Sequence, residues 1–302
     1  MSTDPTARAA SGRATLLVAL SACSFGMIPI FVTLATRSGT PLIDVLVGRY
    51  GLAAVLLGVI AWFGGTRTLR REGLRIVTIL GILQALIAYT SLIALQYISA
   101  ATLSFLFYTY PAWVAVIARV RHSEPFTRLR LFALGLSLAG VVVMVGSPPP
   151  SASSLHPHGV LLALGSAMIY AAYVPLLAEL QRGFSPPTIA AYMASGAAAV
   201  FLLAKVMSGS MAFHMTSVAI RSVLGLAIIS TTIAFMLFLR GLRQLGPVRT
   251  AIISTIEPFC TALLGAWFLG QPLTRTTLIG GAFVAAAVVL LQLRTETQAG
   301  PA

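Results

Sequence analysis

Apolar residues fill ten long stretches of this chain, and polar residues gather in the short segments between them. A helix that crosses a lipid bilayer needs about 20 predominantly apolar residues, and each stretch is close to that length. The pattern therefore predicts ten transmembrane helices joined by short connections. The predicted helices cover residues 14–36, 43–63, 74–95, 99–119, 129–147, 158–180, 186–206, 217–240, 246–269 and 276–293.

The widest interruption of this pattern is a segment rich in proline and serine at residues 147–154. Such a composition favours a linker, so the chain is predicted to divide into two halves of five helices each. We expect a cytoplasmic tail at 1–13, a first five-helix repeat at 14–147, a linker at 148–157, a second five-helix repeat at 158–293 and a cytoplasmic tail at 294–302.

The two halves also resemble each other in sequence. Pro111 and Pro258 lie in the fourth and ninth predicted helices, and the similar segments 125–128 and 272–275 follow them at the same spacing. Because each half has an odd number of helices, the second half must enter the membrane from the opposite side. The sequence thus predicts an all-α membrane protein whose ten transmembrane helices form two inverted-topology five-helix repeats. Secondary transporters often have this architecture, with a substrate site near the membrane midplane.

Composition and charge agree with a membrane protein. Hydrophobic residues make up 58% of the chain and charged residues only 9%, whereas soluble domains carry about 25% charged residues. Most of the 20 Lys and Arg residues fall on the predicted cytoplasmic side. This bias accounts for the net charge of +13 without a nucleic-acid partner and predicts cytoplasmic N- and C-termini. The basic residues on the predicted outer side are Arg37, Lys205, Arg221 and Arg275, and Arg49 lies within the second helix.

Glu257, followed directly by Pro258, is an acidic residue well inside an apolar span. An unpaired carboxylate costs several kcal/mol in surroundings without water, so Glu257 needs a partner or a proton. One interpretation is that Glu257 recognises an ammonium group or relays protons. The other is structural: Glu257 forms an ion pair with Arg49, or burial keeps its carboxyl protonated.

Four prolines within the predicted helices each remove one backbone hydrogen bond. They are Pro29, Pro111, Pro175 and Pro258. Freed carbonyls and kinks at corresponding depths of the two halves favour hinges or a polar binding site. The alternative is a set of static kinks that let the helices pack around a cavity.

Aromatic and hydroxyl side chains supply the other predicted contacts to a substrate. Aromatic faces suit flat rings and attract organic cations, although packing alone also accounts for aromatic residues in membranes. Ser and Thr hydroxyls often only bond the preceding turn of their helix. The predicted substrate-binding set is Glu257, Ser254, Tyr89, Tyr108, Tyr110, Trp113, Tyr170, Tyr173, Thr231 and Thr232.

Other chemistries are not indicated. The four His residues lie in or near predicted loops without metal-ligand spacing, and two cysteines, Cys23 and Cys260, make neither a disulfide framework nor a zinc pattern. The sequence contains no Gly-rich phosphate loop or nucleophile elbow. We therefore expect no metal, no cofactor and no enzymatic activity, and we expect transport to draw on gradients rather than on ATP.

These features together resemble the drug/metabolite transporter superfamily, in particular its ten-helix EamA-type transporters. The resemblance covers about residues 14–293 and rests on the two halves, Glu257-Pro258, the helix endings Glu124-Pro125 and Gln271-Pro272, and the segment around Arg49. Gln271 departs from the family pattern, which has Glu at this ending.

The resemblance implies a multi-pass protein of the bacterial inner membrane that exports small amphipathic metabolites by alternating access. The leading substrates expected are amino acids, with a preference for aromatic ones. The alternative is efflux of drugs or organic cations such as viologens. The partners expected are a small-molecule substrate and the lipid bilayer, with protons as a coupling ion and the protein as a monomer or weak homo-oligomer.

Overall fold

The computed structural model describes residues 5–64, 71–94, 97–98, 103, 106–121, 127–145, 156–181, 183–209, 212–270 and 273–293, and the structural statements below concern these residues. The first half of the chain contributes α1 (Pro5–Gly26), α2 (Ile28–Arg37), α3 (Leu42–Phe63), α4 (Arg71–Ala94), α6 (Tyr110–Val120) and α7 (Arg128–Val145). The second half contributes α8 (Pro157–Leu180), α9 (Pro186–Met207), α10 (Ser217–Ala227), the π-helix η1 (Ile228–Ile233), α11 (Ala234–Leu245), α12 (Pro247–Ser254), α13 (Glu257–Leu269) and α14 (Arg275–Leu293).

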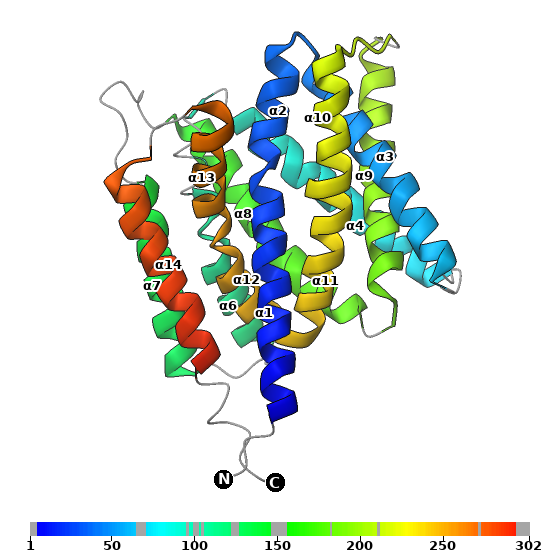
Figure 1. Ribbon diagram of the computed structural model, residues 1–302. Coiled ribbons are helices and arrows are strands. Elements are labelled where there is room, and N and C mark those ends of the chain that lie inside the picture. The colour runs from blue at the N-terminus through cyan, green and yellow to red at the C-terminus, as the bar shows by residue number, and fades with distance from the viewer. Residues whose placement is uncertain are drawn as a thin grey trace.

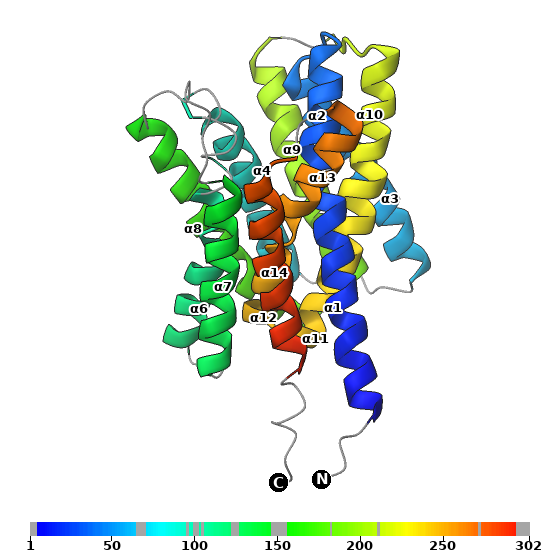
Figure 2. The ribbon, with the colours of Figure 1, turned by 60° about the vertical axis from the view of Figure 1, so that its left-hand side comes forward.

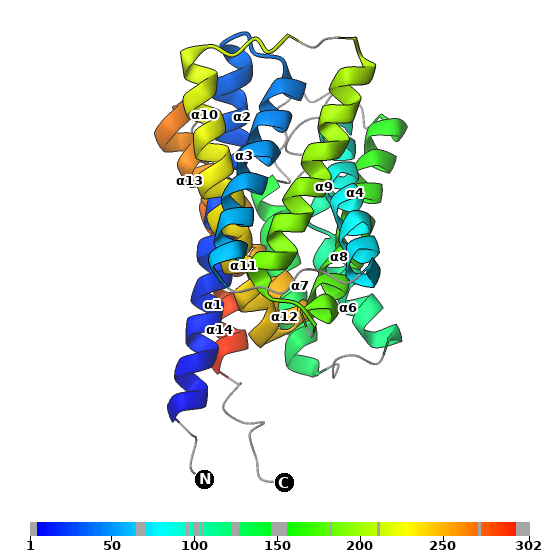
Figure 3. The same ribbon diagram turned by 90° about the vertical axis from the view of Figure 1, so that its right-hand side faces the viewer.

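The helices form one bundle and run roughly along a common axis (Figures 1 and 3). The beginning of α1 and the end of α14 lie at the same end of the bundle (Figure 1). α1 already begins at Pro5, within the predicted cytoplasmic tail. Most of the predicted linker at 148–157 and the whole tail at 294–302 lie outside the described residues, as do Pro125, Gln271 and Pro272.

Six described helical stretches are long and apolar enough to cross a membrane, when judged by length and composition. They are Ala10–Arg37, Leu42–Phe63, Pro157–Leu180, Pro186–Met207, Ser217–Leu245 and Pro247–Leu269, and three shorter apolar helices cover Thr78–Ser91, Tyr110–Val120 and Leu278–Leu290. Large apolar side chains on the outside of the bundle, such as Trp62 and Trp267, suit contact with lipid. The chain is therefore a multi-pass all-helical membrane protein, while the count of ten spans stays a prediction.

Proline accounts for several breaks in the long helices. Pro29, Pro111 and Pro258 each lie in the first turn of a new helix, namely α2, α6 and α13. A proline fits there because the first backbone N–H groups of a helix have no partner within the helix. Pro175 differs, because α8 continues through it. Three of the four predicted hinge positions thus coincide with helix breaks.

Helices at corresponding positions of the two halves pack against each other. The most extensive contacts join α7 to α14 and α3 to α9, and both pairs lie side by side in Figures 1 and 3, with α7 and α14 clearest in Figure 2. α4 crosses α9 closely at two glycines, where a Cβ added to Gly81 would lie 2.5 Å from the Cα of Gly196. Small residues allow such close helix contacts in membranes.

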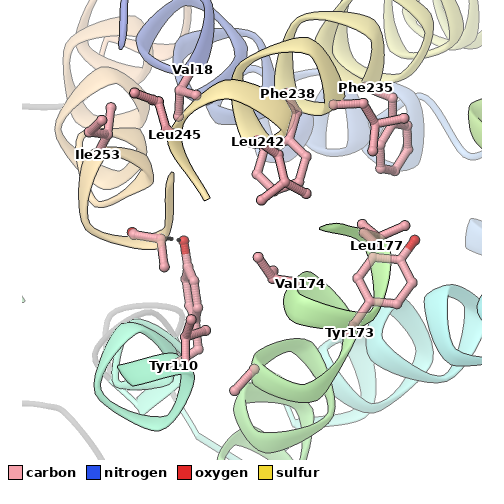
Figure 4. Close-up of a cluster of buried hydrophobic side chains, with 14 of the residues drawn as sticks. Val18, Tyr110, Tyr173, Val174, Leu177, Phe235, Phe238, Leu242, Leu245 and Ile253 are labelled. Carbon is pink, nitrogen blue, oxygen red and sulfur yellow. Dashed lines mark hydrogen bonds between the residues drawn. The ribbon is translucent and has the colours of Figure 1, made fainter. Parts of the chain in front are cut away.

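The interior between α1, α8, α11 and α12 is filled by apolar side chains. Figure 4 shows Val174 and Leu177 of α8 opposite Leu242 of α11, with Ile253 and Leu245 beside them. All five are at most 6% exposed. This apolar layer belongs to one buried cluster that also contains Tyr108, Tyr110 and Tyr173 of the tyrosine-rich region described below.

Two side-chain pairs join distant parts of the chain. Cys23 of α1 and Cys260 of α13 form a disulfide, with their Cα atoms 5.2 Å apart, which corrects the expectation that the cysteines have no such role. Asp44 and Lys205 form a buried ion pair between the beginning of α3 and the end of α9. Hydrophobic pattern alone cannot pair residues so far apart in sequence, so neither link was predicted.

Candidate functional site

Glu257 is the first residue of α13 and follows the break after α12, which ends at Ser254. Its side chain is half-buried within the bundle. The Tyr108 hydroxyl lies near enough to act as a hydrogen-bond partner of the carboxyl group, and the positive charge of Arg49 acts on it from farther away. Arg49 and Glu257 are both described, and they make no ion pair with each other. The predicted structural pairing of these residues is therefore absent, although their charges face the same region.

Tyrosines from α6 and α8 gather beside Glu257. The ring centroids of Tyr110 and Tyr170 are 4.7 Å apart with their planes perpendicular, and those of Tyr170 and Tyr173 are 6.0 Å apart in a stacked arrangement. The ring centroids of Tyr108 and Tyr110 are 6.1 Å apart. The Tyr110 hydroxyl donates to the Ala251 carbonyl at 3.4 Å. Perpendicular and offset rings are favourable aromatic contacts.

A second polar group extends this region toward α3 and α4. The Gln84 amide donates to the Tyr50 hydroxyl at 3.2 Å, and the Tyr50 ring stacks on Phe201 of α9 with centroids 5.6 Å apart. The Gln84 carbonyl and the Tyr173 hydroxyl are buried without a hydrogen-bond partner among the described residues. A buried polar atom without a partner costs free energy, so these atoms are available to a bound molecule or to water.

Arg49 reaches from α3 to η1. Its Nε donates to Thr231 Oγ1 at 2.9 Å, its Nη2 lies 3.4 Å from the Ser230 carbonyl, and its guanidinium lies over the Tyr50 ring at 4.8 Å. Single-turn π-helical segments often occur at functional sites. The π-helix therefore brings backbone and hydroxyl acceptors to a buried cation.

The predicted substrate-binding residues divide into two groups. Tyr108, Tyr110 and Tyr170 lie in the region of Glu257, and Tyr173 stacks on Tyr170. Ser254 on α12 and Thr231 and Thr232 on η1 are buried. Tyr89 and Trp113 do not join them, since these side chains are 55% and 39% exposed on the outside of the bundle. Helical periodicity does not explain this difference, because Tyr110 and Trp113 are three residues apart in α6 and share a face; packing between helices separates them.

The sequence patterns do not single out Tyr50 as a site residue, and they indicate Arg49 as a structural partner for Glu257 and as part of the family resemblance. Both residues are adjacent in α3, and both are at most 5% exposed. A charged residue inside an apolar span by itself indicates a functional site, so the sequence supports Arg49 as a site residue as strongly as Glu257.

A cavity of about 330 Å³ lies away from these residues between α4 and α8. Leu161, Leu162, Gly165 and Ile169 form most of its lining, and its polar content is small. It offers few groups for recognition. The region around Glu257 instead combines an acid, a base, aromatic faces and unpartnered hydroxyls, which is the chemistry needed to bind an amphipathic small molecule with an aromatic ring and charged groups.

Comparison with known proteins gives a consistent result. The sequence model of a family described as the EamA-like transporter family matches residues 12–146 and again residues 157–293. An uncharacterized transporter of Archaeoglobus fulgidus is 29% identical over 197 residues, covering 65% of this chain and 68% of that protein. An uncharacterized inner membrane transporter, YicL of Salmonella typhimurium, is 25% identical over 214 residues, covering 70% of each chain. Protein PecM of Dickeya dadantii is 22% identical over 184 residues, covering 60% of this chain and 61% of PecM.

The crystal structure of another protein has a similar fold. It superposes with a TM-score of 0.80 over 93% of this chain and 98% of its own, at 16% sequence identity. At this identity the likeness concerns the fold alone.

Proposed function

The chain belongs to the EamA-like transporter family, and we propose that it is a secondary transporter that exports small amphipathic metabolites, chiefly amino acids with an aromatic preference. We place it in a bacterial inner membrane, with protons as the coupling ion. In this proposal ten transmembrane helices form two inverted halves, and the substrate passes through a central site by alternating access.

The observation that carries this proposal is the tyrosine cluster around Glu257. Tyr108 and Tyr110 come from the first half of the chain, while Tyr170 and Glu257 come from the second half. A site between halves is where an inverted-repeat transporter binds its substrate. Aromatic faces favour a flat ring, and a carboxylate favours an ammonium group, so an aromatic amine or amino acid fits both features.

The helix breaks next to this site support the alternating-access part of the proposal. The breaks before Pro111 and Pro258 border the tyrosine cluster and Glu257. Broken helices supply backbone groups to a site and allow one segment to move relative to the next. The apolar layer of Leu177, Leu242 and Ile253 would then close one side of the site while the other side is open.

A second candidate function is efflux of organic cations. It is favoured by the single carboxylate of Glu257 among tyrosine faces, because aromatic rings and a negative charge both attract cations. Arg49 disfavours it, since a buried positive charge near the site repels a second one.

Transport by purified protein in liposomes tests the proposal. We expect uptake or exchange of labelled phenylalanine, tyrosine or tryptophan above empty liposomes, and a dependence on the imposed pH gradient. Glu257→Gln should reduce this transport by at least about tenfold, because a charge-assisted hydrogen bond contributes about 1.5–3 kcal/mol.

Glu179→Gln is the matched control, because Glu179 pairs with Arg121 at the surface of the bundle and is half exposed there. This variant should transport as the wild type does. Wild-type protein that moves no member of a broad amino-acid panel, but moves labelled organic cations in a Glu257-dependent manner, would replace the first function with the second.

A further inference from the structure

Arg49 carries a buried positive charge that has no acidic partner among the described residues. It is 5% exposed, and its two hydrogen bonds go to neutral oxygens of η1. Asp44, the nearest acid along α3, is already paired with Lys205. Glu257 acts on Arg49 only at a distance. A buried charge without a counter-ion is costly, so this guanidinium is suited to receive an anion from elsewhere.

The remaining hydrogen-bonding capacity of Arg49 is on one side of its planar group. Nε and Nη2 are used by Thr231 and Ser230, whereas Nη1 has no acceptor among the described residues. Thr231 is fixed in turn, since its hydroxyl donates to the Leu226 carbonyl at 2.8 Å. The guanidinium is thus held along one edge and free along another, which is the orientation needed to bind a carboxylate.

Two other hydroxyls of η1 have no partners of their own. Ser230 Oγ and Thr232 Oγ1 are buried, with exposures of 0% and 6%, and neither has a hydrogen-bond partner among the described residues. They belong to the same π-helical segment as Thr231. Buried, unsatisfied hydroxyls in the same segment that contacts an uncompensated cation indicate that a polar group binds along this segment.

We infer that Arg49 and the hydroxyls of η1 form a carboxylate subsite, and that Glu257 binds the ammonium group of the same substrate molecule. The inference rests on the proposed function and specifies its substrate class as zwitterionic amino acids. The Arg49 charge acts on the Glu257 carboxyl although the two groups make no ion pair, so we place the two charges of an α-amino acid between them. Its side chain would then lie against Tyr110 and Tyr170.

This arrangement also explains how the site would reject other amphipathic molecules. An amine without a carboxylate leaves Arg49 unpaired, and a carboxylate without an amine leaves Glu257 unpaired. A molecule with only one of the two charged groups therefore makes one charge-assisted contact fewer and leaves the other protein charge buried without a partner. Specificity arises from this penalty as much as from attraction.

The decisive experiment measures competition against labelled phenylalanine in proteoliposomes that contain the wild-type protein. The competitors are phenylalanine, phenethylamine, phenylalanine amide and 3-phenylpropionate, which share one ring and differ in their charged groups. We expect phenylalanine to compete at a concentration at least about tenfold lower than each of the others. Equal competition by phenethylamine or phenylalanine amide would overturn the carboxylate subsite while leaving amino-acid transport in place.

Variants assign the effect to residues. Arg49→Gln should lower phenylalanine transport by about tenfold or more and leave competition by phenethylamine unchanged. Arg49→Lys should recover part of the preference, because it restores the charge without the planar fork. Arg121→Gln is the matched control at the surface and should leave the ranking of competitors as in the wild type. A loss of phenylalanine and amine recognition in parallel in folded Arg49→Gln would also overturn the inference.

Failure of the proposed function gives a different result. If wild-type protein transports no amino acid, thermal stabilisation of the purified protein by each competitor replaces the transport measurement. Stabilisation by phenylalanine well above phenethylamine would support the subsite without the transport, and equal or absent stabilisation by phenylalanine would overturn the subsite as well. The wild-type measurements decide the question even if Arg49→Gln does not fold.

Discussion

Charged residues inside this bundle are few, and most have partners that local sequence does not reveal. Lys205 contacts both Asp44 and the Ala212 carbonyl, and the backbone N–H of His214 donates to Asp44. The pair is at most 2% exposed. It joins the beginning of α3 to the end of α9 and to the connection that follows α9. Position in the sequence assigned Lys205 to the outer side, but only the packing of α3 against α9 brings it to Asp44.

Removal of one partner of this pair should destabilise the protein. Lys205→Met leaves the Asp44 carboxylate buried without its counter-charge, which costs about 3–5 kcal/mol in comparable buried pairs. The midpoint of thermal unfolding in detergent should therefore fall clearly for the single variant. The double variant Asp44→Leu with Lys205→Met should recover most of the loss, because it removes both charges. Equal midpoints for the single and double variants would show that the pair contributes little.

The residues of the candidate site were predictable to different degrees. Glu257 stands out in sequence because an acid within an apolar span is rare. Tyrosines are less distinctive, and one-dimensional counting assigned Tyr89 and Trp113 to the same group as Tyr110. Which face of a helix meets its neighbours depends on packing between helices, so these two could be separated from Tyr110 only with the structure.

Among the helices, breaks at proline could be predicted, whereas the π-helix could not. Proline is read directly from the sequence and ends a run of hydrogen bonds wherever it occurs. Even so, Pro175 produces no break in α8, because neighbouring helices can hold such a helix together. η1 contains no proline or glycine, and its register arises from contacts such as that between Thr231 and Arg49.

The crossing of α4 and α9 at Gly81 and Gly196 gives a prediction at the same scale. A Cβ at Gly81 would meet the Gly196 backbone at 2.5 Å, so the two helices must separate to accommodate it. Gly81→Ala should lower stability by about 1–3 kcal/mol, as expected for overpacking. Unfolding of the variant, followed by tryptophan fluorescence or loss of helix signal, measures this change.

Gly58 of α3 is the matched control, because nothing lies within 4 Å of a Cβ added there. Gly58→Ala should leave stability unchanged or raise it by about 0.5–1 kcal/mol through helix propensity. If Gly81→Ala and Gly58→Ala behave alike, close contact between α4 and α9 is not important for stability.

At the scale of the whole molecule, the double match to one family and the packing of α7 on α14 and of α3 on α9 describe two related halves. The sequence predicted these halves from repeated proline positions and from the odd number of helices in each. It could not predict which helices of the two halves meet, since hydrophobic pattern carries no information on pairing between spans.

The topology gives a further prediction. The excess of arginine in the segments assigned to the cytoplasm predicts that both ends of the chain lie there. A green fluorescent protein fused to the C-terminus should fluoresce in a bacterial host, and alkaline phosphatase fused at the same position should be inactive. An active phosphatase fusion at that position would contradict a cytoplasmic C-terminus. With a cytoplasmic N-terminus, it would also contradict an even number of transmembrane spans.

The disulfide between Cys23 and Cys260 has a mechanical consequence. It joins α1 of one half to α13 of the other, beside the break at Met27 and the break at Thr255–Ile256. Gly26 lies against the backbone of Glu257 at the same crossing. If the halves rock during transport, they cannot separate at this point, which becomes a fulcrum. The helices of the two halves must then move more, the farther they lie from the disulfide. Glu257 is three residues from Cys260 and therefore stays close to the axis of rotation.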